Sequence, residues 1–140
     1  MRKIIGIGET VFDIIFRNEQ PTAGVPGGST FNALISLGRT LGVRHPEHPI
    51  FMITEAGNDH IGDITLKFMR DNHVMTDGVS RSLGKSHLSL AFLNEQSDAQ
   101  YEFYKDHKSV HLSTEQIEKI NGVSSNDLIL FGSFFAINPV

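Results

Sequence analysis

Residues 26–34 read Pro-Gly-Gly-Ser-Thr-Phe-Asn-Ala-Leu, a glycine pair that leads into a segment with helical spacing of apolar residues. Paired glycines let a backbone approach a ligand closely, and the free amides of a helix that begins there face the same ligand. Asn32 stands in the first turn of this helix, where its amide offers a donor and an acceptor to a pair of polyol hydroxyls. The alternative is a glycine turn with a polar cap, and this segment alone does not decide between the two.

Apolar residues recur at helical spacing in three segments of the chain. These segments are residues 29–42, 59–72 and 113–121. Asn58 or Asp59 is placed to cap the second segment, and Ser113 with Gln116 has the spacing of a capping box. The sequence therefore predicts three helices.

Three unbroken apolar runs predict the strands of the body. They lie at residues 3–8, 50–54 and 127–131. Their length and β-branched content are typical of strands that are buried on both faces, as in a parallel sheet. Strands that alternate with helices predict an α/β fold with a parallel central sheet flanked by helices.

Two further segments have the alternating pattern of antiparallel β structure. Residues 87–105 predict a hairpin around the polar break at 95–98, and residues 11–26 are an extended stretch that leads to the glycine pair. We expect both segments to form a small antiparallel β lid beside the α/β body, within one domain that spans residues 1–140.

Composition and charge exclude several classes of protein. The 140 residues contain no cysteine, and a net charge of -4 with scattered Lys and Arg does not favour nucleic acid as a partner. The amino-terminal apolar run is too short for a signal or a membrane-spanning segment, so we expect a cytoplasmic protein. His45 and His48 flank Pro46 without a third ligand nearby, so we expect no metal site.

Two motifs in order resemble the opening signature of a known family. Residues 8–13, Gly-Glu-Thr-Val-Phe-Asp, followed by the glycine pair and Asn32, resemble ribokinase-like (PfkB) carbohydrate kinases, particularly of the fructokinase type. Residues 57–62, Gly-Asn-Asp-His-Ile-Gly, resemble the Gly-x-Asp-x-x-Gly segment of the same family. The resemblance implies a ribokinase-like fold in which the β lid covers a small sugar substrate.

The resemblance also implies which residues hold the sugar: Asp13, Gly27, Gly28 and Asn32. An aspartate that faces vicinal hydroxyls makes charge-assisted hydrogen bonds and orients the ring toward the phosphate donor. A solvated strand carboxylate is the alternative interpretation of Asp13.

A stripe of residues on the second lid segment is a further candidate. Tyr101, Phe103 and Lys105 share one strand face, so Phe103 and Lys105 are expected to close over the sugar as an aromatic wall with a cationic tip. Similar kinases often carry Arg in place of Lys105, and a point charge argues against an acidic sugar. Alternatively, the stripe packs the lid or forms a homodimer through the β lid.

The catalytic parts that the resemblance implies do not occur in these 140 residues. The Gly-Ala-Gly-Asp segment, whose Asp is the base and whose amides hold the phosphate, is missing, as is the Asn-x-x-Glu motif tied to magnesium. We therefore expect a truncated chain without catalytic residues, inactive by itself. ATP and Mg²⁺ are expected for the full-length parent, with no tight binding to this chain.

Two alternatives to a kinase remain at this point. One is an inactive sugar-binding or self-associating fragment that uses an exposed sheet edge. The other, more remote, is a dinucleotide-binding oxidoreductase domain, because Gly6-Ile7-Gly8 begins a fingerprint whose third glycine is replaced by Val11.

Overall fold

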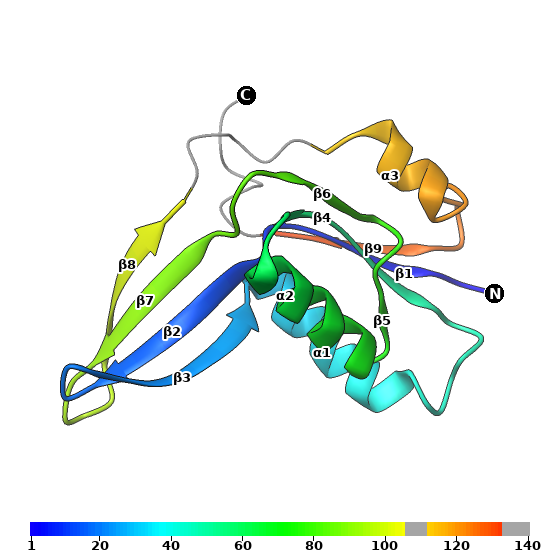
Figure 1. The fold of residues 1–140 in the computed structure, drawn as a ribbon. Helices are drawn as coiled ribbons and strands as arrows, with labels where there is room; N and C mark the ends of the chain where they lie inside the picture. The colour runs from blue at the N-terminus through cyan, green and yellow to red at the C-terminus, as the bar shows by residue number, and fades with distance from the viewer. Residues whose placement is uncertain (106–111, 133–140) are drawn as a thin grey trace.

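The computed structural model describes residues 1–105 and 112–132, which form an α/β body and a smaller sheet that projects from it (Figure 1). The body sheet has the strand order β5-β4-β1-β9, and all its pairs are parallel. Its strands are β1 (Ile4–Ile7), β4 (Ile50–Gly57), β5 (Val74–Met75) and β9 (Leu128–Phe131). Strand β6 (Val79–Leu83) pairs in parallel with the carboxyl-terminal part of β4. The predicted parallel central sheet is confirmed.

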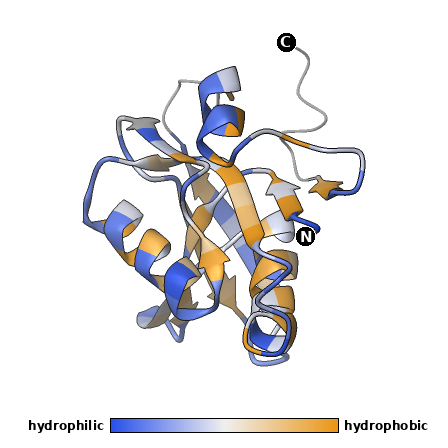
Figure 2. Ribbon diagram, turned by 90° about the vertical axis from the view of Figure 1, so that its right-hand side faces the viewer, coloured by the Kyte–Doolittle hydropathy of each residue, from blue (hydrophilic) through white to orange (hydrophobic). Residues whose placement is uncertain are grey.

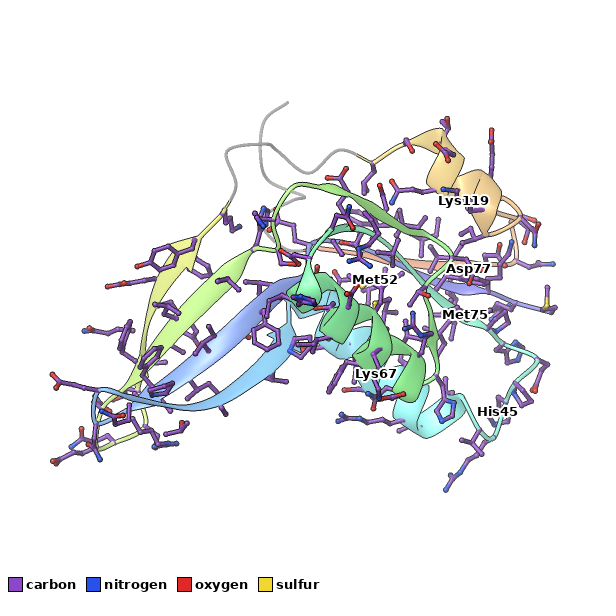
Figure 3. All side chains as sticks on the ribbon, in the orientation of Figure 1. His45, Met52, Lys67, Met75, Asp77 and Lys119 are labelled. Atoms are coloured by element: carbon purple, nitrogen blue, oxygen red, sulfur yellow. The ribbon has the colours of Figure 1, made fainter. Side chains whose placement is uncertain are left out.

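Alternating residues of β4 bury the two faces of this sheet against different helices. Ile50 and Met52 pack in one cluster with the buried side chains of α1 (Ser29–Leu41) and α2 (His60–Asp71), and Met52 lies between the strand and these helices (Figure 3). Phe51 and Ile53 pack on the other face with Ile120, which directly follows α3 (Thr114–Lys119). Figure 2 shows the hydrophobic colour concentrated on the central strands. The period of two along a strand thus builds a core on each face.

The three helices begin close to where the sequence predicts them. The Asp59 carboxylate accepts a hydrogen bond from the Gly62 amide at 2.8 Å and caps α2. At the start of α3, the Ser113 amide donates to Oε1 of Gln116 at 3.0 Å, as in the predicted capping box. Both contacts satisfy amides that a helix start leaves without an intrahelical partner.

The projecting sheet, which we call the lid, has the order β3-β2-β7-β8. Its strands are β2 (Val11–Arg17), β3 (Gln20–Gly27), β7 (Leu88–Leu93) and β8 (Ala99–Tyr104). The two hairpins β2–β3 and β7–β8 are antiparallel as predicted, but β2 and β7 pair in parallel. The wholly antiparallel lid expected from the sequence is therefore wrong in this one pair. The reason is that β2 and β7 follow the parallel strands β1 and β6, so both leave the body in the same direction.

Strand β9 differs from its prediction as a strand buried on both faces. All four of its side chains are exposed, from 40% at Leu130 to 69% at Phe131, and among the described residues it pairs only with β1. Apolar composition predicts a strand but does not reveal what covers it.

No helix in the described part of the chain combines the length and the apolar character needed to cross a membrane.

Candidate functional site

The site is built where the parallel strands end and α1 begins. The Thr30 hydroxyl, in the first turn of α1, donates to the carbonyl of Ile7 at 3.4 Å. A Cβ added to Gly8 would lie 2.9 Å from the Thr30 hydroxyl oxygen, and one added to Gly132 would lie 3.6 Å from it. The carboxyl ends of β1 and β9 therefore meet the amino terminus of α1, as is usual for ligand sites in open α/β sheets.

The glycine pair makes two close backbone approaches at this point. Gly28 has a φ of 122°, and a Cβ there would lie 2.6 Å from the carbonyl oxygen of Glu9. A Cβ on Gly27 would lie 2.5 Å from Oδ2 of Asp13. The first position requires glycine for its backbone angle and the second for space, so the pair is more than a flexible turn.

Asp13 lies on β2 with its carboxylate beside the backbone of Gly27. The strand register pairs Asp13 with Ser89 of β7, and Ser89 with Phe103 of β8, so these three side chains share one face of the lid. Two strand spacings separate Asp13 from Phe103, about 10 Å. Burial raises the pKa of the Asp13 carboxyl, and the hydroxyl of Ser89 acts in the opposite direction.

The predicted stripe on β8 is present as expected. The rings of Tyr101 and Phe103 stack with centroids 6.1 Å apart, and Nζ of Lys105 lies 5.7 Å from the Phe103 centroid. More than half of each ring's residue surface is exposed. These three side chains thus form one continuous surface, at one end of the row that begins with Asp13.

Lys105 also forms an ion pair with Glu9 that the sequence prediction missed. Its Nζ lies 3.0 Å from Oε2 of Glu9, whose side chain is only 12% exposed. Since the Glu9 carbonyl contacts Gly28, this residue joins the stripe on β8 to the glycine pair. Glu9 lies two residues after the end of β1, inside the motif at residues 8–13, and its place in that motif was the one signal that pointed to it.

Asn32 lies one turn into α1 and is exposed. Its backbone amide donates to the carbonyl of Gly28 at 2.8 Å, while no described residue forms a hydrogen bond with its side-chain amide. The structure thus brings Asp13, the glycine pair and Asn32 to one place. Phe103 and Lys105 lie across the lid from this place.

The third motif, residues 57–62, has a structural role rather than a place among these contacts. The Asp59 carboxylate accepts hydrogen bonds from the hydroxyl of Ser86 at 2.6 Å and from its amide at 2.8 Å, besides that from Gly62. Burial raises the pKa of Asp59, but these hydrogen bonds outweigh it and the net pKa is lowered. Asp59 therefore fixes the start of α2 to the segment that enters β7, and so positions the lid.

The remaining candidates are a groove and the histidines. An open groove of about 530 Å³ lies on the other face of the lid, where Leu88 and Tyr104 border it together with Lys105. Within the described residues, no three His, Asp or Glu side chains converge as metal ligands. His45 lies at the end of the molecule away from the lid (Figure 3).

The remote dinucleotide alternative does not fit this topology. A dinucleotide fingerprint lies between a strand and the helix that directly follows it. Here β1 is followed by the lid strand β2, and the first helix starts only at Ser29. Gly8 simply follows the end of a strand.

Comparison with known proteins relates the fold to sugar kinases. No protein-family model and no curated protein sequence matches this chain. Among solved structures, fructokinase from Xylella fastidiosa is similar with a TM-score of 0.61 and 20% identity, over 75% of this chain and 34% of that one. The 2-dehydro-3-deoxygluconokinase of Thermotoga maritima has a TM-score of 0.69 and 16% identity, over 88% of this chain and 39% of that one.

A sugar kinase from Pyrococcus horikoshii in complex with ATP is also similar, with a TM-score of 0.60 and 23% identity, over 74% of this chain and 34% of that one. The chain thus spans little more than a third of the length of these proteins. The predicted ribokinase-like fold is confirmed, and with it the resemblance at the level of the fold.

Proposed function

We propose that this chain is the sugar-holding part of an ATP-dependent carbohydrate kinase that phosphorylates a hydroxyl of a small, fructose-like sugar in the cytoplasm. The observation that carries the proposal is the approach of the Asp13 carboxylate to Gly27, where a Cβ would lie 2.5 Å from Oδ2. The missing side chain at Gly27 keeps the carboxylate beside a bare backbone, which gives a hydroxyl-bearing ring room to approach.

Each proposed contact has a chemical role in holding a polyol. The Asp13 carboxylate accepts hydrogen bonds from two neighbouring hydroxyls, and the amide of Asn32 offers both a donor and an acceptor. Gly27 and Gly28 let the sugar approach the amino terminus of α1. Phe103, about 10 Å from Asp13 across the lid, covers the apolar face of the ring. Lys105 closes the end of the site beyond Phe103.

Catalysis in this proposal belongs to residues other than those of this chain. Phosphoryl transfer needs a base for the substrate hydroxyl, a magnesium site and dipoles that stabilise the transferring phosphate. The sequence has neither the Gly-Ala-Gly-Asp nor the Asn-x-x-Glu motif. The ATP complex of the similar sugar kinase supports ATP as the donor of the whole enzyme. We propose that the isolated chain binds sugar weakly and transfers no phosphate.

Sugar titration followed by amide chemical shifts tests the binding proposal. D-fructose should shift the amides of Gly27, Gly28 and Asn32, and Asp13→Ala should abolish the shifts because the main acceptor is lost. Asp98→Ala is a matched control, since Asp98 is an exposed lid carboxylate in the turn before β8. Fructose shifts that persist unchanged in Asp13→Ala would refute the assigned site. An ADP-release assay with fructose, ATP and Mg²⁺ tests inactivity, and magnesium-dependent turnover by the chain would refute it.

Self-association is a second candidate function, and the exposed edges favour it. The stripe on β8 and the four apolar side chains of β9 lie on strands that each pair with only one other strand in the described structure. Unpaired edges with apolar side chains tend to recruit further strands. Light scattering should then show dimers whose population rises with concentration and falls in Phe103→Ser, which removes an exposed ring from the edge. A strict monomer at high concentration would exclude this function.

A further inference from the structure

The ion pair between Glu9 and Lys105 decides the charge at one end of the proposed sugar site. Lys105 is the cation of the stripe on β8, and its Nζ lies 3.0 Å from Oε2 of Glu9. The Lys105 side chain is 34% exposed and that of Glu9 12%, so the pair lies at the edge of the protein rather than in open solvent. In such a setting the two charges largely cancel for any ligand beside them.

The sugar kinases that share this fold divide into two substrate classes by their names. Fructokinase is named for a neutral ketose, and 2-dehydro-3-deoxygluconokinase for a sugar acid. A free ammonium at the tip of the aromatic wall would attract the carboxylate of a sugar acid through a charge-assisted hydrogen bond. An ammonium already held by a carboxylate offers no such advantage, and Glu9 itself repels an incoming carboxylate.

We infer that Glu9 is a specificity-determining residue that makes this site select neutral sugars over sugar acids by pairing with Lys105. The inference rests on the proposed sugar-binding function and deepens it. Glu9 is suited to this role because its carbonyl contacts the obligatory glycine at position 28, so its backbone is fixed. Asp13, at the other end of the row, adds a second negative charge that disfavours an acid.

A competing explanation is that the pair only fastens the lid to the body, since it joins residues far apart in sequence. The two explanations differ in what they predict for ligand choice. A fastening role changes the stability of the lid and weakens both sugars together. A selectivity role changes the ratio of the two affinities and leaves the fold intact.

Titrations of the full chain with D-fructose and with D-gluconate at fixed ionic strength separate the two explanations. The wild-type protein should prefer fructose, and Glu9→Gln should raise the affinity for gluconate about tenfold, the scale of one charge-assisted hydrogen bond. Fructose affinity should stay within about twofold, because a neutral hydroxyl responds little to a change of charge beside it. The double variant Glu9→Gln/Lys105→Gln should lose the gain for gluconate.

Glu115→Gln is the matched control, since it removes the same charge from an ion pair with Lys119 on α3, outside the site, where Glu115 is 70% exposed. The ratio of its affinities for fructose and gluconate should equal that of the wild-type protein. Lys105→Gln gives a second test that does not depend on how well Glu9→Gln folds: it leaves Glu9 unpaired and should weaken gluconate further.

The outcomes distinguish failure of the inference from failure of the function. An unchanged ratio in Glu9→Gln, or stronger gluconate binding in Lys105→Gln, overturns the selectivity role while fructose binding still stands. If the wild-type protein and all variants bind neither sugar, the proposed function itself fails.

Discussion

Replacing Lys3 by methionine should lower the free energy of unfolding by about 3 kcal/mol. Lys3 is 8% exposed and its ammonium donates to three carbonyls in the turn after α3, those of Ile120 at 3.1 Å, Asn121 at 3.2 Å and Gly122 at 2.7 Å. A hydrogen bond to a charged group contributes about 1.5–3 kcal/mol. The three bonds share one ammonium and are not additive, so we assign about one strong bond plus the desolvation of the carbonyls left behind.

Urea denaturation followed by circular dichroism measures this loss, and methionine keeps most of the side-chain volume. Lys67→Met is the control, because Lys67 pairs with Asp71 on the exposed surface of α2, where such a pair contributes only about 0.3–0.5 kcal/mol. A loss in Lys3→Met no larger than that in Lys67→Met would refute the argument that the buried ammonium holds the turn after α3 against β1.

Three further predictions concern the site and its support. Asp13→Asn should raise the free energy of unfolding at pH 7 while weakening sugar binding. Burial raises the pKa of Asp13 in the folded state, so its negative charge opposes folding above that pKa. The gain in unfolding free energy should therefore vanish in urea titrations below pH 3.8, the pKa of the unfolded chain. Gly28→Ala should lower the free energy of unfolding by about 1–3 kcal/mol because of the strained φ of 122°. The loss should be larger if the Glu9 carbonyl cannot move away from the new Cβ. A melting temperature equal to that of the wild type would contradict this prediction. Asp59→Ala should lower the free energy of unfolding by about 1–2 kcal/mol through loss of the helix cap. It should also speed amide hydrogen exchange in β7, because Asp59 holds the segment that enters this strand. Unchanged exchange in β7 would show that other contacts position the lid. Because the pKa of Asp59 is lowered, its contribution is present above pH 3.8 and is lost as the pH falls through the folded pKa, which urea titrations across that range would reveal.

The sequence was sufficient to predict the helices and strands that local patterns define. The helices, the capping residue Asp59 and the strands β1, β4 and β9 follow from periodicity and cap chemistry, which act over a few residues. Strands β5 and β6 were not predicted, since β5 has only two residues and β6 carries no unbroken apolar run. Their partner β4, rather than their own composition, makes them strands.

The candidate site shows the same division between local and distant information. Asp13, the glycine pair and Asn32 could be proposed from the sequence because they lie in short motifs, and the structure gives a steric reason for each glycine. The ion pair of Glu9 with Lys105 joins residues 96 positions apart, and no local pattern indicates such a contact. The parallel pairing of β2 with β7 was missed for the same reason, because register between distant strands depends on the body that carries them.

That parallel pair also bears on the order in which we expect the molecule to assemble. The strands β2 and β7 come from opposite sides of α1, β4 and α2 in the sequence, so they meet only across a long loop whose closure costs entropy. Until the body has brought the ends of β1 and β6 side by side, Asp13 has no Ser89 opposite it and the row to Phe103 does not exist. We therefore expect the surface that we assign to recognition to form late in folding, after the body has brought the two hairpins together.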